Sequence, residues 1–86
     1  MKKFNFLITD KNGLHARPAG AIASTAKSFK SDIFVYFDGK TADAKRLLSL
    51  MSLGATTGKE LSFEISGEDE ELAFTEIEKI CKEKLS

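Results

Sequence analysis

Residues 33–43 read IFVYFDGKTAD, and this stretch decides the fold. The apolar run over residues 33–37 is typical of a strand. Asp38-Gly39 is a preferred two-residue hairpin turn, because its residues tolerate positive φ angles. A second strand over residues 40–43 then returns beside the first. A tight hairpin at the centre of the chain predicts an antiparallel sheet.

The side chains of this hairpin divide between the two faces of the predicted sheet. Because successive strand residues point to opposite faces, Ile33, Val35 and Phe37 fall on one face, and Phe34 and Tyr36 fall on the other. We expect helices to cover the first face and solvent to reach the second. The two exposed aromatic side chains then stabilise the sheet by cross-strand contact, with self-association through this face as the alternative.

Alternating apolar residues predict two further strands, one over residues 3–8 and one over residues 60–66. Between the first strand and the hairpin, apolar residues follow a helical period from residue 16 to residue 29. The residues that repeat on this helical face are Ala19, Ile22, Ala23, Ala26 and Phe29.

Two more helices follow the hairpin. A short one is predicted over residues 46–53, with Gly54 as its left-handed cap. Asp69 is expected to cap a last helix that ends near residue 84 and buries Ala73 and Ile77. The order of elements is therefore βαββαβα, an α+β fold with an antiparallel sheet and its helices on one face.

Length and composition suit one small domain over residues 1–86. Hydrophobic residues make up 42% of the chain and charged residues 30%, which is neither a disordered nor a membrane composition. The longest apolar run, residues 33–37, is too short to span a bilayer, and the first ten residues read as a strand rather than a signal peptide. The single cysteine, Cys81, suits a packing role in a reducing cytoplasm, so we expect a cytoplasmic protein.

The formal net charge of zero hides an uneven distribution of charge. Residues 1–58 hold nine Lys or Arg against four Asp or Glu, and residues 59–86 hold four against nine. A basic surface of this kind suits acidic protein partners. Nucleic acid is a poor fit because no dense basic stripe is present. No cluster of residues has metal-ligand spacing, and we expect neither a metal nor a cofactor.

The chain has one histidine, His15, and its position favours chemistry over a structural role. It stands between a turn that contains Gly13 and a helix that begins at Ala16. The first backbone N–H groups of a helix have no partner within it, and together with the helix dipole they bind anions, phosphate above all. Pro18 suits the same first turn, because it has no N–H to leave unpaired.

Arg17 adds a guanidinium group that matches phosphate oxygens in charge and geometry. An imidazole nucleophile, an arginine and a helix N-terminus therefore meet in one small volume. This arrangement suits a transient phosphohistidine, since a positive environment disfavours the imidazolium before attack and stabilises the phosphoryl charge afterwards. With no second catalytic acid or base evident in the sequence, we expect a carrier rather than an independent enzyme.

Residues 13–19, GLHARPA, resemble the active-site signature of the HPr family, the histidine-containing phosphocarriers of the bacterial phosphoenolpyruvate:sugar phosphotransferase system. Residues 44–54, AKRLLSLMSLG, resemble the second block of the same family, and the match runs over essentially the whole chain. The resemblance implies an open-faced β-sandwich, with three helices on one face of a four-stranded antiparallel sheet. It also implies that phospho-Enzyme I phosphorylates His15 on Nδ1, that Arg17 neutralises phosphate charge, and that IIA domains of sugar permeases receive the group.

The short helix supplies a candidate docking surface. Leu50 and Leu53 are expected in the core, whereas the resemblance places the helix beside His15, with Leu47, Leu48 and Met51 as an apolar centre. The alternative is that these three side chains only hold the helix down. The other residues expected to contact partners are the basic rim of Arg17, Lys27, Lys45 and Arg46, together with Ala16, Gly20 and Ser24. We expect the protein to be a monomer.

Arg46 departs from the family pattern. Many relatives carry a serine at this place that a dedicated kinase phosphorylates, and Arg46 has no hydroxyl group. Ser49 and Ser52 lie nearby but do not occupy the regulatory position. We therefore expect no regulatory phosphorylation of the short helix.

Two other functions stay open. The chain could serve a regulatory phosphotransfer circuit, such as a nitrogen-related one, instead of sugar transport. It could also be a protein-binding module in which His15 carries no phosphoryl group.

Overall fold

The computed structural model describes all 86 residues. The predicted hairpin is present, and it is formed by β2 (Asp32–Phe37) and β3 (Lys40–Asp43), with Phe37 paired to Lys40 across the turn. Asp38 and Gly39 both have positive φ, at 51° and 76°, as the Asp-Gly pair predicts.

The sheet has four strands in the order β1-β4-β2-β3, and all neighbouring pairs are antiparallel. The outer strand β1 (Lys2–Leu7) pairs with β4 (Glu60–Ser66), which also pairs with β2. The last strand, β4, lies between β1 and β2, so its pairing joins parts of the chain that are far apart in sequence.

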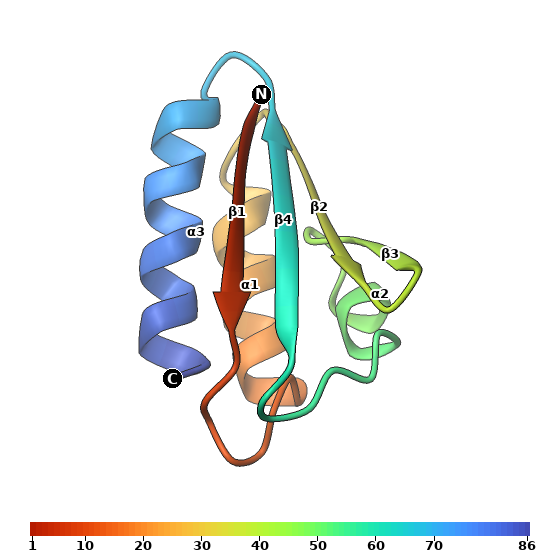
Figure 1. Cartoon of the computed structure of the whole chain (residues 1–86). Helices are drawn as coiled ribbons and strands as arrows, with labels where there is room; N and C mark the ends of the chain where they lie inside the picture. The colour runs from red at the N-terminus through yellow and green to blue at the C-terminus, as the bar shows by residue number, and fades with distance from the viewer.

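The chain has three helices, and Figure 1 shows the first of them behind the sheet, with the last to its left and the short one to its right. They are α1 (Ala16–Lys27), α2 (Leu47–Met51) and α3 (Glu70–Lys84), and α1 packs against both of the others. The βαββαβα order and the open-faced architecture are therefore confirmed. None of the helices is long and apolar enough to cross a bilayer.

The core lies between the sheet and the helices. Leu50 and Leu53 are buried in it, as predicted, while Phe4 stacks on Phe63 with ring centroids 4.7 Å apart. Cys81 is also buried, and this burial, with a smaller effect of Glu78, raises the pKa of its thiol to about 12. The thiol is therefore protonated and packs as a small apolar group.

The opposite face of the sheet is open to solvent, as the alternation in the hairpin predicts. Phe34 and Tyr36 are both exposed there, whereas Ile33 and Val35 are buried and Phe37 is half-buried.

Two helices end earlier than the sequence predicts. The last turn of α1 closes with tighter bonds, in which the N–H groups of Ser28 and Phe29 donate to carbonyls three residues back, so the helix stops at Lys27. In α2 the N–H of Leu53 likewise bonds to the carbonyl of Leu50, and the helix ends at Met51 rather than at residue 53. Helix ends depend on such local tightening, which periodicity does not detect.

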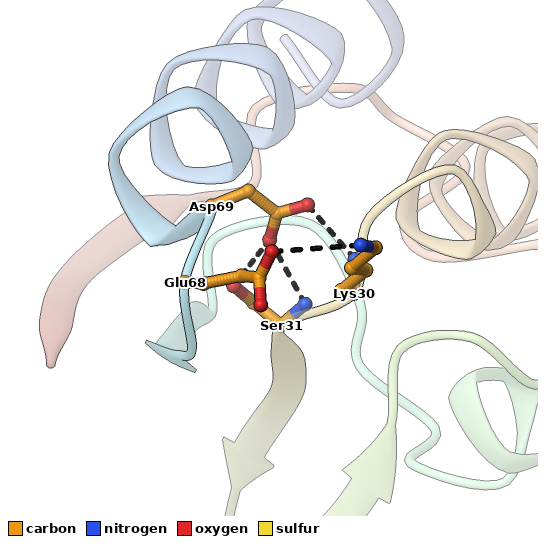
Figure 2. Close-up of polar contacts among 4 residues, drawn as sticks. All are labelled: Lys30, Ser31, Glu68 and Asp69. Carbon is orange, nitrogen blue, oxygen red and sulfur yellow. Dashed lines mark hydrogen bonds and ion pairs between the residues drawn. The ribbon is translucent and has the colours of Figure 1, made fainter.

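The prediction that Asp69 caps α3 is confirmed for the position of the residue but not for its contacts. Asp69 stands at the N-cap position, but its side chain makes no bond to the helix. Its carboxylate instead crosses to the turn between α1 and β2, where it accepts the N–H of Lys30 and the N–H of Ser31, each at 2.9 Å, and the hydroxyl of Ser31 (Figure 2). The hydroxyl bond, followed by the bond from the Lys30 N–H, lowers the pKa of Asp69 below its ordinary value.

The two long helices, α1 and α3, run in opposite directions, so the start of each helix lies at the same end of the molecule as the end of the other (Figure 1). The start of α3 meets the finish of α1 through Asp69. At the other end, the carbonyl of Leu85, just after α3, accepts the N–H groups of Thr9 and Asp10 at 2.9 and 3.0 Å. This second end holds the loop that leads into α1.

Candidate functional site

His15 is the residue immediately before α1, with an extended backbone (φ −105°). Its carbonyl accepts the N–H of Ala19 at 3.0 Å, which starts the helix, but its side chain makes no capping bond. The imidazole is 40% exposed. The side chain of a residue at this position often caps the helix, but the ring of His15 forms no such bond and is available to react.

The loop before His15 is fixed by Gly13 and Leu14. Gly13 has φ +67°, and a Cβ there would lie 2.8 Å from the carbonyl oxygen of Ala55, so only glycine fits. Leu14 is buried, and its N–H donates to the same Ala55 carbonyl at 3.0 Å. The buried leucine and the close contact between the two loops set where the next residue, His15, emerges.

The first turn of α1 offers unpaired donors beside the ring. The N–H groups of Ala16 and Arg17 have no acceptor within the chain, and Pro18 has no N–H. The first turn contains no acidic side chain to occupy these donors. Both Ala16 and Arg17 are exposed, and the Arg17 guanidinium forms no ion pair within the protein. The turn therefore presents a partial positive charge with open access.

These groups border a shallow depression of about 340 Å³. Part of its wall comes from the last turn of α3, which the Leu85 contacts bring to this end of the molecule. The lining residues are Asp10, Asn12, His15, Arg17, Pro18, Ala21, Glu83 and Lys84. The depression is polar and open, which suits a small charged group carried at the surface better than an enclosed substrate.

The sequence reasoning missed Asp10. No second catalytic acid or base near His15 is evident in the sequence. The structure places a carboxylate oxygen of Asp10 3.9 Å from Nε2 of His15. The signal was a carboxylate five positions before the histidine, followed by Asn12-Gly13, which folds the loop back.

The apolar residues predicted to form a docking surface are exposed together on α2. Leu47 and Met51 are 38% and 39% exposed, and Leu48 is 79% exposed. Their exposure leaves these side chains available for contact with a partner, and their role in docking stays a prediction. The helices α1 and α2 also pack against each other.

The residues predicted around this centre differ in how freely they meet solvent. Ser24 and Lys27 are exposed, and Gly20 is half-buried with open space above its Cα. Lys45 is half-buried, and its ammonium group donates to the carbonyl of Phe29 at 2.9 Å. Arg46 is exposed at the N-cap of α2. The ammonium group of Lys45 is therefore hydrogen-bonded within the protein, whereas Arg46 is exposed to solvent.

Ser49 and Ser52 are both tied to the backbone of this region. The oxygen of Ser49 accepts the N–H of Asp43 at 3.1 Å, and the hydroxyl of Ser52 donates to the carbonyl of Ser49 at 2.7 Å. The side chain of Arg46 makes no capping bond to α2.

Comparison with known proteins gives one consistent family. A family model described as the PTS HPr component phosphorylation site matches residues 2–83. The phosphocarrier protein HPr of Mycoplasma genitalium is 42% identical over 85 residues, which cover 98% of this chain and 96% of that protein. Such relatives are named phosphocarrier proteins, not enzymes.

Solved structures agree with the sequence matches. The crystal structure of an HPr from Thermoanaerobacter tengcongensis has a TM-score of 0.91 at 38% identity, covering 99% of this chain and 96% of that one. Crh, a catabolite repression protein of Bacillus subtilis, has a TM-score of 0.76 at 36% identity, covering 100% and 99% of the two chains, and its crystal structure is described as a domain-swapped dimer.

Proposed function

The chain belongs to the HPr family of phosphotransferase-system phosphocarriers, and from that premise we propose that His15 accepts a phosphoryl group from phospho-Enzyme I and donates it to IIA domains of sugar permeases. One observation carries the proposal: the exposed ring of His15 stands beside two backbone N–H groups that have no acceptor. The proposal treats residues 1–86 as one HPr-like domain, which the shared core of sheet and helices supports.

In the first step, the lone pair of Nδ1 of His15 attacks phosphorus. A new N–P bond forms while the bond between phosphorus and the donor histidine breaks, and its electron pair returns to the donor ring. The three phosphoryl oxygens then lie beside the first turn of α1. The N–H groups of Ala16 and Arg17 stabilise the added negative charge, as does the guanidinium of Arg17.

The second step requires that this stabilisation is moderate. The site is an open surface with two backbone donors and one arginine, so a bound phosphoryl group remains within reach of an acceptor. An acceptor histidine attacks phosphorus from the solvent side, the Nδ1–P bond breaks, and its electron pair returns to His15. A deeper and better-ligated site would hold phosphate too tightly for a carrier.

We propose that partners dock on the surface formed by Leu47, Leu48 and Met51 and by the exposed residues of α1. Apolar side chains at the centre with basic residues at the rim suit a brief, electrostatically steered encounter. Leu48 is the most exposed of the three and should contribute to binding without stabilising the fold. Leu48→Ala is expected to raise the KM for a IIA domain and to leave kcat and thermal stability unchanged. An unchanged KM would remove Leu48 from the docking surface.

We propose that α2 carries no regulatory phosphoserine. Arg46 offers no hydroxyl at the position that the resemblance identifies, and Ser49 and Ser52 are both engaged in hydrogen bonds. Incubation with the HPr serine kinase and ATP should leave the intact mass unchanged, whereas the same incubation of Arg46→Ser should add one phosphate. Phosphate on the wild-type helix would contradict this part of the proposal.

We propose that the carrier acts as a monomer. The open face of the sheet exposes Phe34 and Tyr36 on β2 and Leu7 on β1, and the polar residues of β4 lie between them, so no broad apolar surface forms. Crh shows that a chain of this fold is able to exchange segments between copies. Sedimentation velocity at several protein concentrations should give one species of monomer mass, and a stable dimer would overturn the proposal.

The proposal is tested by incubation of the protein with phosphoenolpyruvate and Enzyme I, followed by intact-mass measurement. Wild type should gain one acid-labile phosphate, and His15→Ala should gain none. The phosphorylated protein is then offered to sugar-type and nitrogen-type IIA proteins. Faster transfer to the sugar type supports the proposed circuit, and faster transfer to the nitrogen type replaces it with the regulatory one.

A further inference from the structure

We propose that Asp10 is a positioning residue for His15, which keeps the ring proton on Nε2 and so leaves the lone pair on Nδ1. The inference deepens the proposed function and rests on it. Asp10 lies in the loop between β1 and α1, and its Oδ2 is 3.9 Å from Nε2 of His15. Of the carboxylates in the chain, it alone lies within 4 Å of a nitrogen of this ring.

Three hydrogen bonds hold Asp10 in place, two through its backbone and one through its carboxylate. Its own N–H donates to the carbonyl of Leu85 at 3.0 Å, which anchors it to the end of α3. Its carbonyl accepts the N–H of Gly13 at 3.0 Å, and its Oδ2 accepts the N–H of Asn12 at 3.0 Å. Since backbone and side chain are both fixed, the negative charge is in position before any partner arrives.

Gly13 links the two residues directly. Its N–H donates to the carbonyl of Asp10, and its carbonyl accepts the N–H of His15 at 3.1 Å. The glycine is irreplaceable because of its positive φ and its contact with Ala55, so the relative placement of the two side chains is built into the loop. At 3.9 Å the two atoms are farther apart than in a hydrogen bond, and a small rotation of the His15 ring or one bridging water would complete the contact.

A neutral imidazole carries one proton, and the nitrogen that faces an acceptor keeps it. With Asp10 facing Nε2, the proton stays there and Nδ1 is free to attack phosphorus. When the Nδ1–P bond forms, the ring becomes an imidazolium that still holds the Nε2 proton, and the Asp10 carboxylate stabilises this positive charge.

The same proton matters for release of the phosphoryl group. When the Nδ1–P bond breaks, the electron pair returns to Nδ1, and the leaving group is a neutral imidazole only if Nε2 is protonated. Without that proton the leaving group would be an imidazolate, which is a far poorer one. Asp10 therefore acts on the ring, whereas Arg17 acts on the phosphoryl oxygens. The other charged groups that line the depression are Glu83 and Lys84, and neither pairs with the ring.

The test compares wild type with Asp10→Asn, which retains an oxygen to accept the Asn12 N–H but removes the charge. Glu83→Gln is the matched control, because it removes a carboxylate from the same depression without touching the ring pair. Nitrogen-15 NMR of the unphosphorylated imidazole in basic solution reports which ring nitrogen holds the proton. Wild type and Glu83→Gln should hold the proton on Nε2, and Asp10→Asn should show a larger share on Nδ1. Equal populations in all three would overturn the inference.

A kinetic readout separates this role from a structural one. Transfer from the phosphorylated protein to a IIA domain at about pH 8 should slow by about two- to fivefold in Asp10→Asn, the range that a partly exposed charge pair supports, with an unchanged KM. The deficit should shrink toward pH 6, because solvent protons then supply Nε2. A deficit that is equal at every pH, or none, would contradict the inference.

Asp10→Glu, which keeps the charge on a longer side chain, should restore part of the rate and of the tautomer population. If Enzyme I leaves wild type unphosphorylated, the proposed function fails, and the tautomer measurement still decides the role of Asp10 because it needs no phosphoryl donor.

Discussion

Both long helices start without a side-chain capping bond, but the polar groups around the two starts make different contacts. At one end, the carboxylate of Asp69 accepts two backbone N–H groups and a hydroxyl, and Lys30 pairs with Glu68 at 3.5 Å (Figure 2). At the other end, the N–H groups at the start of α1 have no acceptor and the ring of His15 caps nothing.

This difference means that one end of the molecule contributes to the stability of the fold and the other is available for phosphoryl transfer. Unpaired backbone donors at a helix start are a cost to the fold, and a serine or aspartate before α1 would remove that cost. The chain places His15 there instead, which leaves the donors open for a phosphoryl group. At one end of the molecule, here called the tied end, Asp69 connects the start of α3 to Lys30 and Ser31 in the turn before β2. The end that holds His15, Ala16 and Arg17 is called the open end. The bonds of the tied end stabilise the fold without involving the open end.

The largest effect is expected from a substitution in the first turn of α1, at the open end. Arg17→Ala removes the only side-chain cation of the first turn of α1, and phosphoryl transfer should fall by about 10²- to 10³-fold, as for other losses of a charge-stabilising donor. Because Arg17 is exposed and unpaired, the free energy of unfolding should change by less than about 0.5 kcal/mol. Stopped-flow transfer assays and urea unfolding check the two parts. A matching loss of stability would mean that Arg17 holds the fold rather than the phosphate.

The next effect breaks the tied end. Gly67 has φ +155°, and a Cβ there would lie 2.6 Å from Cα of Ser31, which is backbone and has no room to move. Gly67→Ala should therefore lower the free energy of unfolding by about 2–4 kcal/mol. Gly39→Ala is the control, since it has positive φ but meets no atom within 4 Å, and it should cost about 1 kcal/mol. Equal costs in urea unfolding would show that no clash occurs at Gly67.

The smallest effect concerns the pH dependence of the tied end. The lowered pKa of Asp69 means that the unfolded chain binds its proton more readily than the folded one. Its stabilising contribution is therefore fully present above about pH 4 and is lost as pH falls through the lower folded pKa. Asp69→Asn should be less stable than wild type at pH 7, and the gap should narrow toward pH 3.

Asp38→Asn is the control for this pH series, because Asp38 sits in the hairpin turn and its carboxylate forms no ion pair. Glu70 also has a lowered pKa, mainly through the N–H of Gly67, so wild type and both variants share its acid sensitivity. A gap between wild type and Asp69→Asn that stays constant from pH 7 to pH 3 would contradict the assignment.

Much of the fold could be predicted from local sequence signals. Asp38-Gly39 determines its own turn, and alternation in the hairpin assigns Ile33 and Val35 to the core because strand geometry admits only two faces. The position of His15 before a helix was also readable, since Gly13 and Pro18 are signals of a turn and a first helical turn.

What failed depended on contacts between distant parts of the chain. Asp69 looks like a helix cap in sequence, yet its hydrogen-bond partners lie 38 and 39 residues earlier. Asp10 gains its place beside His15 partly through Leu85, at the far end of the chain. A local sequence pattern does not predict the contacts of Asp69 or of Asp10, because both depend on the antiparallel packing of α1 and α3.

The central claim is that the open end of α1 binds the phosphoryl group while the tied end is unaffected. A ¹H–¹⁵N correlation spectrum recorded before and after phosphorylation by Enzyme I tests this most directly. The account predicts that the amide protons of Ala16 and Arg17 move the farthest, as they gain an anionic acceptor, and that those of Lys30 and Ser31 stay in place. Unmoved Ala16 and Arg17 amides in a phosphorylated protein, or equal shifts at Lys30 and Ser31, would contradict it.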